Sequence, residues 1–262
     1  MKAQFDEVIG LIPAAGRATR LPSLTGSKEV IPIGSEMPDD SAPAHPKVAC
    51  EYLLDHLKKA RINKAYIVLR EGKWDIPAYF GDGTACGIHL AYLMMGLPHG
   101  PPFTLDQAYP FVQHSLIALG FPDIIFGADD AFAKLIATQT ETHADVVLGL
   151  FPADQPEHVD MVDTGDDFRV RQIIIKPAQT TLRHTWGIAV WTPAFTHFMH
   201  EYLLTIRSSF ETDKDNGREL HVGNVIQAAI DHGLKVMALP VSDKPYVDIG
   251  VPGNLEKVTG KN

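Results

Sequence analysis

The sequence predicts an α/β fold with a mostly parallel sheet. Its first apolar run, residues 8–13, is almost unbroken, as expected for a parallel strand that is buried on both faces. Further apolar runs at residues 65–69 and 88–93 alternate with segments such as 47–60, which has the period of an amphipathic helix. This alternation places helices over the sheet, right-handed crossovers between strands, and a site at their carboxyl ends.

The expected elements follow this alternation along the chain. In the first half, strands are expected at residues 8–13, 65–69, 88–93, 123–127 and 145–151. Helices are expected between them at residues 47–60, 105–119 and 131–142, with a short helix or turn at 74–80. Proline-rich or glycine-rich loops are expected at residues 35–46 and 96–102.

The second half continues with a different mixture of elements. Strands are expected at residues 168–175, 184–191, 235–241 and 246–249. Helices are expected at residues 193–206, 218–232 and 252–258. Because no repeat, low-complexity tract or linker interrupts the 262 residues, we expect a single domain.

Composition narrows the class of protein. The net charge of −9 argues against nucleic acid or an anionic membrane as a partner. Two cysteines in a chain of this length do not build a disulfide framework. Asp6 and Glu7 interrupt the N-terminal stretch, and no apolar run approaches a signal peptide or a membrane span. We therefore expect a cytoplasmic protein.

A loop of small residues follows the first strand. Ala14, Ala15 and Gly16 allow the backbone N–H groups to come close to an anion. Arg17 and Arg20 add positive charge in the same loop. Lys28 adds a third cation before the next apolar run. The pattern suits a polyphosphate, although it is neither a P-loop nor a dinucleotide-binding fingerprint.

Residues 13–21 and 27–33 together resemble the signature of the sugar-1-phosphate nucleotidyltransferases. That family includes glucose-1-phosphate thymidylyltransferases and UTP–glucose-1-phosphate uridylyltransferases. One departure is Ala18, where the family usually has a second glycine. The resemblance implies a Rossmann-like mixed sheet flanked by helices, the nucleotide-diphospho-sugar transferase fold. It divides the single domain into a nucleotide-binding half, residues 1–151, and a sugar-phosphate-binding half, residues 152–262.

The resemblance also implies a reaction. A nucleoside triphosphate, with dTTP or UTP favoured, would combine with a sugar 1-phosphate to give a nucleotide-sugar and pyrophosphate, with Mg²⁺ as cofactor. Arg20 and the loop 14–17 would hold the β- and γ-phosphates, and Lys28 would stabilise charge on the α-phosphate. The implied partners are these two small molecules, without nucleic acid or membrane, and a homo-oligomer is left open.

Asp129 and Asp130 follow the expected strand 123–127, and a metal ligand is expected at such a strand end in an open α/β sheet. Two adjacent carboxylates suit Mg²⁺, and the resemblance implies that one of them is a ligand without deciding which. The alternative is that one only caps the next helix. Asp248, in the segment Tyr-Val-Asp-Ile-Gly-Val-Pro, resembles the second metal ligand of the family, and its alternative is an ordinary turn aspartate.

Three more residues resemble the family's sugar-phosphate side. Lys176 matches the lysine of a Glu-Lys-Pro motif, but Ile175 stands in place of the glutamate, which commonly bonds sugar hydroxyls in relatives. Gly187 lies in a strand that the resemblance places under the sugar. Glu219 matches a glutamate that approaches the sugar ring. The alternatives are a solvated strand end for Lys176 and a helix-dipole contact for Glu219.

The base-binding residues are the least determined. Met95 stands where thymidylyl and uridylyl enzymes often have a glutamine, and methionine cannot read a base edge by hydrogen bonds. Backbone groups of the loop around Gly100 are the other candidates. Two alternative functions stay open. One is transfer of a nucleotide to a non-sugar phosphate, and the other is a sensor that binds a nucleotide-sugar without catalysis. The twelve histidines form no zinc spacing, and no serine lies in a nucleophile elbow.

Overall fold

The computed structural model describes residues 5, 7–16, 26–33, 47–96, 99–212, 219–251 and 253–255. The strands are β1 (Val8–Pro13), β2 (Lys64–Arg70), β3 (His89–Met95), β4 (Leu116–Gly120), β5 (Ile124–Ile125), β6 (Val146–Pro152), β7 (Asp160–Thr164), β8 (Val170–Ile175), β9 (His184–Trp191), β10 (Val236–Pro240) and β11 (Val247–Asp248). The α-helices are α1 (Ala49–Lys59), α2 (Asp75–Phe80), α3 (Pro101–Asp106), α4 (Tyr109–Val112), α5 (Ala131–Thr142), α6 (Pro193–Thr212) and α7 (Val222–Asp231).

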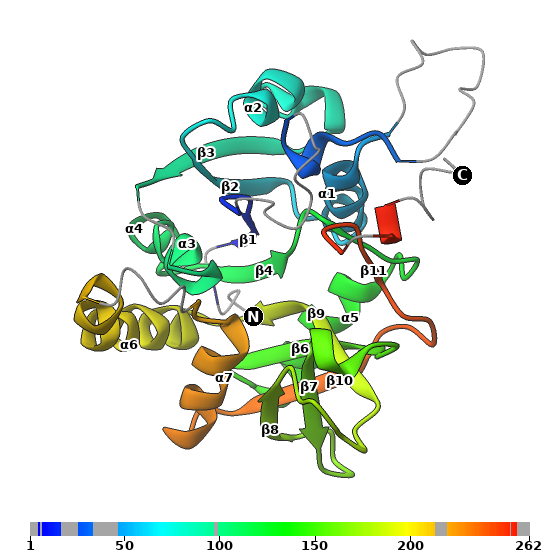
Figure 1. The fold of residues 1–262 in the computed structure, drawn as a ribbon, viewed down its shortest axis with the longest axis vertical. Helices are drawn as coiled ribbons and strands as arrows, with labels where there is room; N and C mark the ends of the chain where they lie inside the picture. Colours follow the sequence, from blue (N-terminus) through cyan, green and yellow to red (C-terminus); the bar gives the residue numbers. More distant parts are fainter. Residues whose placement is uncertain are drawn as a thin grey trace.

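The main sheet confirms the predicted mixed, mostly parallel architecture (Figure 1). Its strand order is β10-β6-β9-β4-β1-β2-β3, and β7 and β8 extend it beside β9. β1 is parallel to β2 and β4, whereas β9 runs antiparallel to β4 and β6. Strands from both halves of the chain therefore meet in one sheet, and the carboxyl ends of β1, β4 and β6 share one edge.

Helices cover both faces of this sheet. Figure 1 shows α1 and α5 on one side of β4 and β9, and α3, α4 and α6 on the other. Two apolar cores result, because alternate residues of β1 enter opposite layers: Ile9 and Leu11 join one core and Ile12 the other. A Cβ at Gly120 would lie 2.2 Å from the Leu53 side chain, so glycine lets α1 pack closely on β4.

Most expected elements are present, but the prediction for residues 105–127 is wrong. Residues 105–119 are not one helix, since α4 ends at Val112 and Leu116–Gly120 form the central strand β4. The expected strand 123–127 shrinks to the two residues of β5. A short apolar run such as residues 116–119 looks the same in a buried helix and a buried strand, which explains the error.

Two smaller differences concern the second half. β7 was not expected, although it pairs along its length with β8. The expected strand 246–249 contracts to Val247–Asp248. The ends of the expected helices 218–232 and 252–258 lie partly outside the described residues. Among the helices that are described, none has the length and apolarity needed to cross a membrane.

Candidate active site

A cavity of about 330 Å³ opens at the carboxyl ends of β1 and β4. Its wall includes Gly16 after β1, Asp123 after β4 and Trp186 near the start of the antiparallel β9. Lys28 and Asp248 line one part of it, and Lys176 lines another. This volume is in the usual range for a small-molecule site. The position agrees with the rule that open α/β sheets bind ligands outside their strand ends.

Lys28 is delivered to the cavity by a 3₁₀ turn, Lys28–Val30, whose flanks are tied to the segment after β2. The Ser27 N–H and Oγ both donate to the Asp75 carboxylate, each at 2.6 Å. The Glu29 carboxylate accepts two bonds from Lys73 Nζ, at 2.6 and 2.8 Å. These contacts fix the backbone on both sides of Lys28, so its side chain is directed by the fold.

The Glu29–Lys73 pair lies in the interior. Its side chains are 1% and 5% exposed. Burial raises the pKa of Glu29 and lowers the pKa of Lys73, and in each case the partner opposes the shift. A pair of this kind is costly to bury and costly to break, because removal of one partner leaves an uncompensated charge in the interior.

Two aspartates meet Lys28 through the pairing of two short strands. β5 and β11 are antiparallel, with Asp248 opposite Ile124, and the Ile249 N–H donates to the Asp123 carbonyl at 3.0 Å. The Asp123 carboxylate forms an ion pair with Lys28. A Cβ at Gly250 would lie 3.0 Å from Asp248 Oδ1, 3.2 Å from Lys28 Nζ and 3.3 Å from Asp123 Oδ2. Both carboxylates and the ammonium therefore surround one point.

These acids keep Lys28 charged. Burial alone lowers the pKa of Lys28, but Asp123, Glu29 and Asp248 together more than offset this effect. The net result is a pKa above the ordinary lysine value. A permanently charged ammonium beside two carboxylates suits a site that binds phosphate together with a cation.

The two carboxylates beside Gly250, those of Asp123 and Asp248, also suit a divalent cation. Asp123 and Asp248 offer hard carboxylate oxygens within reach of one point, and the cavity beside them leaves room for water and phosphate oxygens. Mg²⁺ prefers few carboxylates, several waters and phosphate ligands. Within the described ranges no group of three or more His, Cys, Asp and Glu residues gathers in a metal-binding arrangement. The residues present thus suit Mg²⁺ that is shared with a substrate.

The opposite wall carries a second cation and three titratable groups. Lys176 follows β8 with a left-handed φ of 42°, which directs it out of the strand line. Asp160, Glu219 and His221 line the cavity with it. Burial raises the pKa of Asp160 to about 6, although Lys176 opposes the shift. Burial and then Lys176 lower the pKa of His221.

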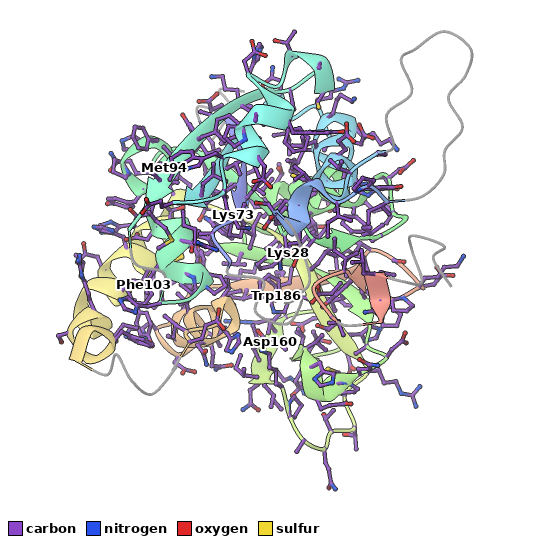
Figure 2. All side chains as sticks on the ribbon, turned by 45° about the horizontal axis from the view of Figure 1, so that its top comes forward. Lys28, Lys73, Met94, Phe103, Asp160 and Trp186 are labelled. Carbon is purple, nitrogen blue, oxygen red and sulfur yellow. The ribbon has the colours of Figure 1, made fainter. Side chains whose placement is uncertain are left out.

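Three aromatic side chains also line the cavity. Phe121 and Trp186 line the cavity with ring centroids 5.9 Å apart. Tyr246 also lines it, and burial raises its pKa to about 12, so the phenol stays neutral. Gly187 does not line the cavity itself; a Cβ there would lie 3.0 Å from the Tyr246 ring. Its contribution is room for Tyr246. Figure 2 places Lys28, Trp186 and Asp160 near the middle of the molecule.

The placement expected for Asp129 and Asp130 is wrong. Neither lines the cavity, and both carboxylates are on the surface with exposed fractions of 67% and 61%. Asp129 pairs with Lys59, whose hydrogen bond lowers the pKa of Asp129, and Asp130 pairs with Lys134. The error follows from the misplaced strand: the buried strand is β4, which ends at Gly120, and the first acid after it is Asp123.

The base-site candidates are also placed differently. Met95 is only 5% exposed, accepts a hydrogen bond from Thr104 and lines a separate hollow with Phe103. Figure 2 shows Phe103 and the neighbouring Met94 to one side of the labelled cavity residues. Gly100 has a φ of 119° and packs against the Leu220 backbone, so it does not face the cavity.

Of the loop residues expected to bind phosphate, the structure describes Ala14, Ala15 and Gly16. Ala14 and Ala15 are buried, and the Ala14 N–H donates to the Val68 carbonyl at 2.9 Å, whereas Gly16 is exposed and lines the cavity. Arg17 and Arg20 lie outside the described residues. Lys28, Lys176, Glu219 and Asp248 are brought together as expected.

The sequence interpretation missed two cavity carboxylates, Asp123 and Asp160. The Pro-Asp pair after the apolar run 116–119 was the available signal for Asp123. Asp160 gave no comparable signal, because its place depends on the unexpected pairing of β7 with β8.

The chain matches known proteins along nearly its whole length. The model of the family described as Nucleotidyl transferase matches residues 9–261. The low-salt glycan biosynthesis nucleotidyltransferase Agl11 of Haloferax volcanii is 22% identical over 231 residues, covering 87% of this chain and 58% of that protein. A glucose-1-phosphate thymidylyltransferase of Streptomyces griseus is 23% identical over 237 residues, covering 88% and 60%. The chain thus spans about three-fifths of the length of these relatives.

The fold is also found in solved structures. One of them is a crystal structure with sucrose of a Bacillus anthracis protein assigned as a glucose-1-phosphate thymidylyltransferase. The two chains superpose with a TM-score of 0.78, covering 97% of this chain and 94% of the other, at 18% sequence identity. At that identity the likeness shows the fold alone.

Proposed function

Because the chain belongs to the nucleotidyl transferase family, we propose that it joins a nucleoside triphosphate to a sugar 1-phosphate and releases pyrophosphate. The observation that carries this proposal is the meeting of Lys28, Asp123 and Asp248 at one point of a cavity that Lys176 also lines. Two separated cations and a carboxylate pair suit two phosphorylated substrates better than one. dTTP and UTP are the favoured triphosphates, because the resembled enzymes use them.

The chemistry needs no general base. The phosphate oxygen of a sugar 1-phosphate is already ionised, and it forms the new bond to the α-phosphorus. The bond between the α-phosphorus and the bridging oxygen breaks, and the electron pair leaves with pyrophosphate. Catalysis then consists of positioning the two phosphates and stabilising the charge that builds on the α-phosphate.

The residues divide these tasks by position. Lys28 would stabilise charge on the α-phosphate and leaving group, and Gly16, which lines the same cavity, would offer its backbone to the phosphates. Lys176, on the other wall, would hold the incoming phosphate, with Glu219 near the organic group. Arg17 and Arg20, beyond the described residues, keep their expected place at the β- and γ-phosphates.

Mg²⁺ would be held by Asp123 and Asp248. When bound, it would supply positive charge at the phosphates, which two carboxylates would otherwise repel. The support is the shared approach of both acids to the Gly250 position. Asp248 is thus retained from the sequence interpretation, and Asp123 replaces Asp129 and Asp130.

A pyrophosphate-release screen tests the proposal. The intact protein is incubated with dTTP, UTP, CTP, ATP or GTP, each with a panel of sugar 1-phosphates, with Mg²⁺ or with EDTA. We expect release only when a triphosphate and a sugar phosphate are both present, and no release with EDTA. Release that does not depend on the sugar phosphate would mean triphosphate hydrolysis, and no release with any pair would contradict the proposed reaction.

A further inference from the structure

Asp160 is a carboxylate that no described donor satisfies. It lines the cavity at the start of β7, and none of the hydrogen bonds or ion pairs among the described residues involves its side chain. Its backbone carbonyl, in contrast, accepts a bond from Thr185 Oγ1 at 2.9 Å. An ionised carboxylate can accept about four hydrogen bonds. A half-buried carboxylate without them is costly unless water or a ligand supplies the donors.

The fold makes room for this carboxylate at one place. A Cβ at Gly223, in the first turn of α7, would lie 2.5 Å from Asp160 Oδ2 and 2.8 Å from Ile175 Cδ1. Any larger residue at 223 would therefore displace the Asp160 side chain. Since β7, β8 and α7 meet at this point, the Asp160 carboxylate is held against the cavity by three elements.

The strand register gives Asp160 a specific relation to Lys176. Asp160 and Ile175 are directly opposed in the β7–β8 ladder, so their side chains lie on the same face of the sheet. Lys176 is the next residue and lines the same cavity. Ile175 occupies the position at which the resembled motif carries an acid before its lysine. Asp160 therefore places a carboxylate on the neighbouring strand, beside the apolar residue that replaces that acid.

The charge of Asp160 decides which part of a substrate it can bind. A carboxylate repels a phosphate group, so Asp160 cannot take the place of Lys176. It can accept hydrogen bonds from the organic group that the phosphate carries. Burial raises the pKa of Asp160 to about 6, which leaves the group mostly ionised at neutral pH and ready to accept such bonds.

We propose that Asp160 is a specificity-determining residue that binds hydrogen-bond donors on the organic part of the phosphate substrate. The donor is a hydroxyl group or an amino group of that substituent, and both present the same N–H or O–H chemistry to the carboxylate. The inference rests on the proposed function, because it assumes that Lys176 holds the phosphate of that substrate. It adds that a carboxylate on β7, beside Ile175, binds the substituent.

Binding measurements test the inference without requiring turnover. Calorimetry compares the wild-type protein with Asp160→Asn for inorganic phosphate, glucose 1-phosphate, glucosamine 1-phosphate and ethanolamine phosphate. Among the organic phosphates, we consider the one that the wild type binds best. We expect Asp160→Asn to lower the affinity for it by about tenfold or more, the loss typical of a hydrogen bond to a charged group. Binding of inorganic phosphate should stay equal or become tighter, because a nearby negative charge is removed.

Asp163→Asn is the matched control. Asp163 lies on the same strand and does not line the cavity. This variant should bind every probe as the wild type does. Equal affinity of wild type and Asp160→Asn for all organic phosphates would overturn the inference, and so would an equal loss for inorganic phosphate. Thermal melting confirms that the variants are folded.

The same set of ligands also shows whether Asp160 binds an ammonium group or hydroxyl groups of the substrate. If an ammonium group is bound, the loss is largest for glucosamine 1-phosphate or ethanolamine phosphate and shrinks as salt is added. If hydroxyl groups are bound, the loss for glucose 1-phosphate is as large and changes little with salt. The proposed function is tested separately: absence of pyrophosphate release contradicts the reaction, whereas unchanged affinities contradict the role of Asp160.

Discussion

Lys28 and Asp160 face the cavity from opposite walls, and their surroundings give them opposite properties. Lys28 has an acidic partner in Asp123, which offsets burial and raises its pKa. Asp160 has only the more distant help of Lys176, so burial raises its pKa to about 6. The first residue is thus stabilised in its charged form. The second is charged at a cost, which is typical of groups that are retained for binding.

Lys28→Ala is expected to leave the fold intact and to reduce turnover by roughly 10²–10³, the loss typical of one preorganised electrostatic group. The measurement is the steady-state rate of pyrophosphate release. Lys64→Ala serves as the control, since it removes only a surface pair with Glu7. Turnover near the wild-type rate in folded Lys28→Ala would remove Lys28 from the mechanism.

Asp160 makes a prediction about stability and pH. Its pKa in the folded protein is about 6, above the ordinary value of 3.8, so the folded state holds its proton more tightly than the unfolded state. Its contribution to the free energy of unfolding is therefore present below the unfolded pKa and is lost as pH rises through about 6. Asp160→Asn lacks this loss.

Urea unfolding at pH 4.5 and pH 7.5 measures the effect. As pH rises from 4.5 to 7.5, the free energy of unfolding of Asp160→Asn should increase relative to that of the wild type by on the order of 1–3 kcal/mol. A difference between the two proteins that does not change with pH would show that Asp160 is not perturbed by burial.

At the scale of elements, the short turn that carries Lys28 depends on the segment after β2. Asp75, at the start of α2, holds Ser27, and Lys73, just before it, holds Glu29. The turn has only three residues and cannot be stable alone. Its position, and with it the direction of Lys28, is therefore set by two polar contacts with a neighbouring element.

Lys73→Met is expected to destabilise the protein by about 3–5 kcal/mol, because it leaves Glu29 buried without its partner. The loss should be larger at pH 8 than at pH 5, since an unpaired Glu29 has a still higher pKa and can take up a proton at the lower pH. Urea unfolding at both pH values measures it. Lys64→Met, which breaks an exposed pair, should cause no measurable change, and an equally small effect of Lys73→Met would contradict the structural role of the pair.

The sequence and the structure agree best where strong patterns occur. The unbroken apolar run of β1 and the loop after it could be recognised, and Lys28, Lys176, Glu219 and Asp248 were placed correctly on the cavity. The first metal-ligand candidate was not, because residues 116–120 were assigned to a helix. That one assignment drew attention to Asp129 and Asp130, whereas Asp123 is the acid that follows β4 and lines the cavity.

Asp160 was missed for a different reason. Its place depends on the pairing of β7 with β8 and on the space left at Gly223. Both are long-range features that no local pattern encodes. A residue that acts through such contacts is recognised only when the strands are placed side by side.

At the scale of the whole molecule, one sheet combines the two halves of the chain. β1 and β4 bring Gly16 and Asp123 to the cavity, whereas β8, β9 and β11 bring Lys176, Trp186 and Asp248. The protein as a whole carries a charge of −9, so its global field does not attract a polyphosphate. In the proposed function, local cations and a metal ion held by Asp123 and Asp248 attract it at the cavity.

The most direct test compares Asp123→Asn with Asp129→Asn in Mg²⁺-dependent pyrophosphate release, with the substrate pair that the wild type uses best. The two substitutions are chemically identical and lie six positions apart, but only Asp123 lines the cavity. We predict that Asp123→Asn lowers the rate by about 10²-fold or more, since it removes a carboxylate from the proposed metal site. Asp129→Asn should retain the wild-type rate. A folded Asp123→Asn protein with the wild-type rate and metal dependence, or a loss of activity confined to Asp129→Asn, would contradict the account.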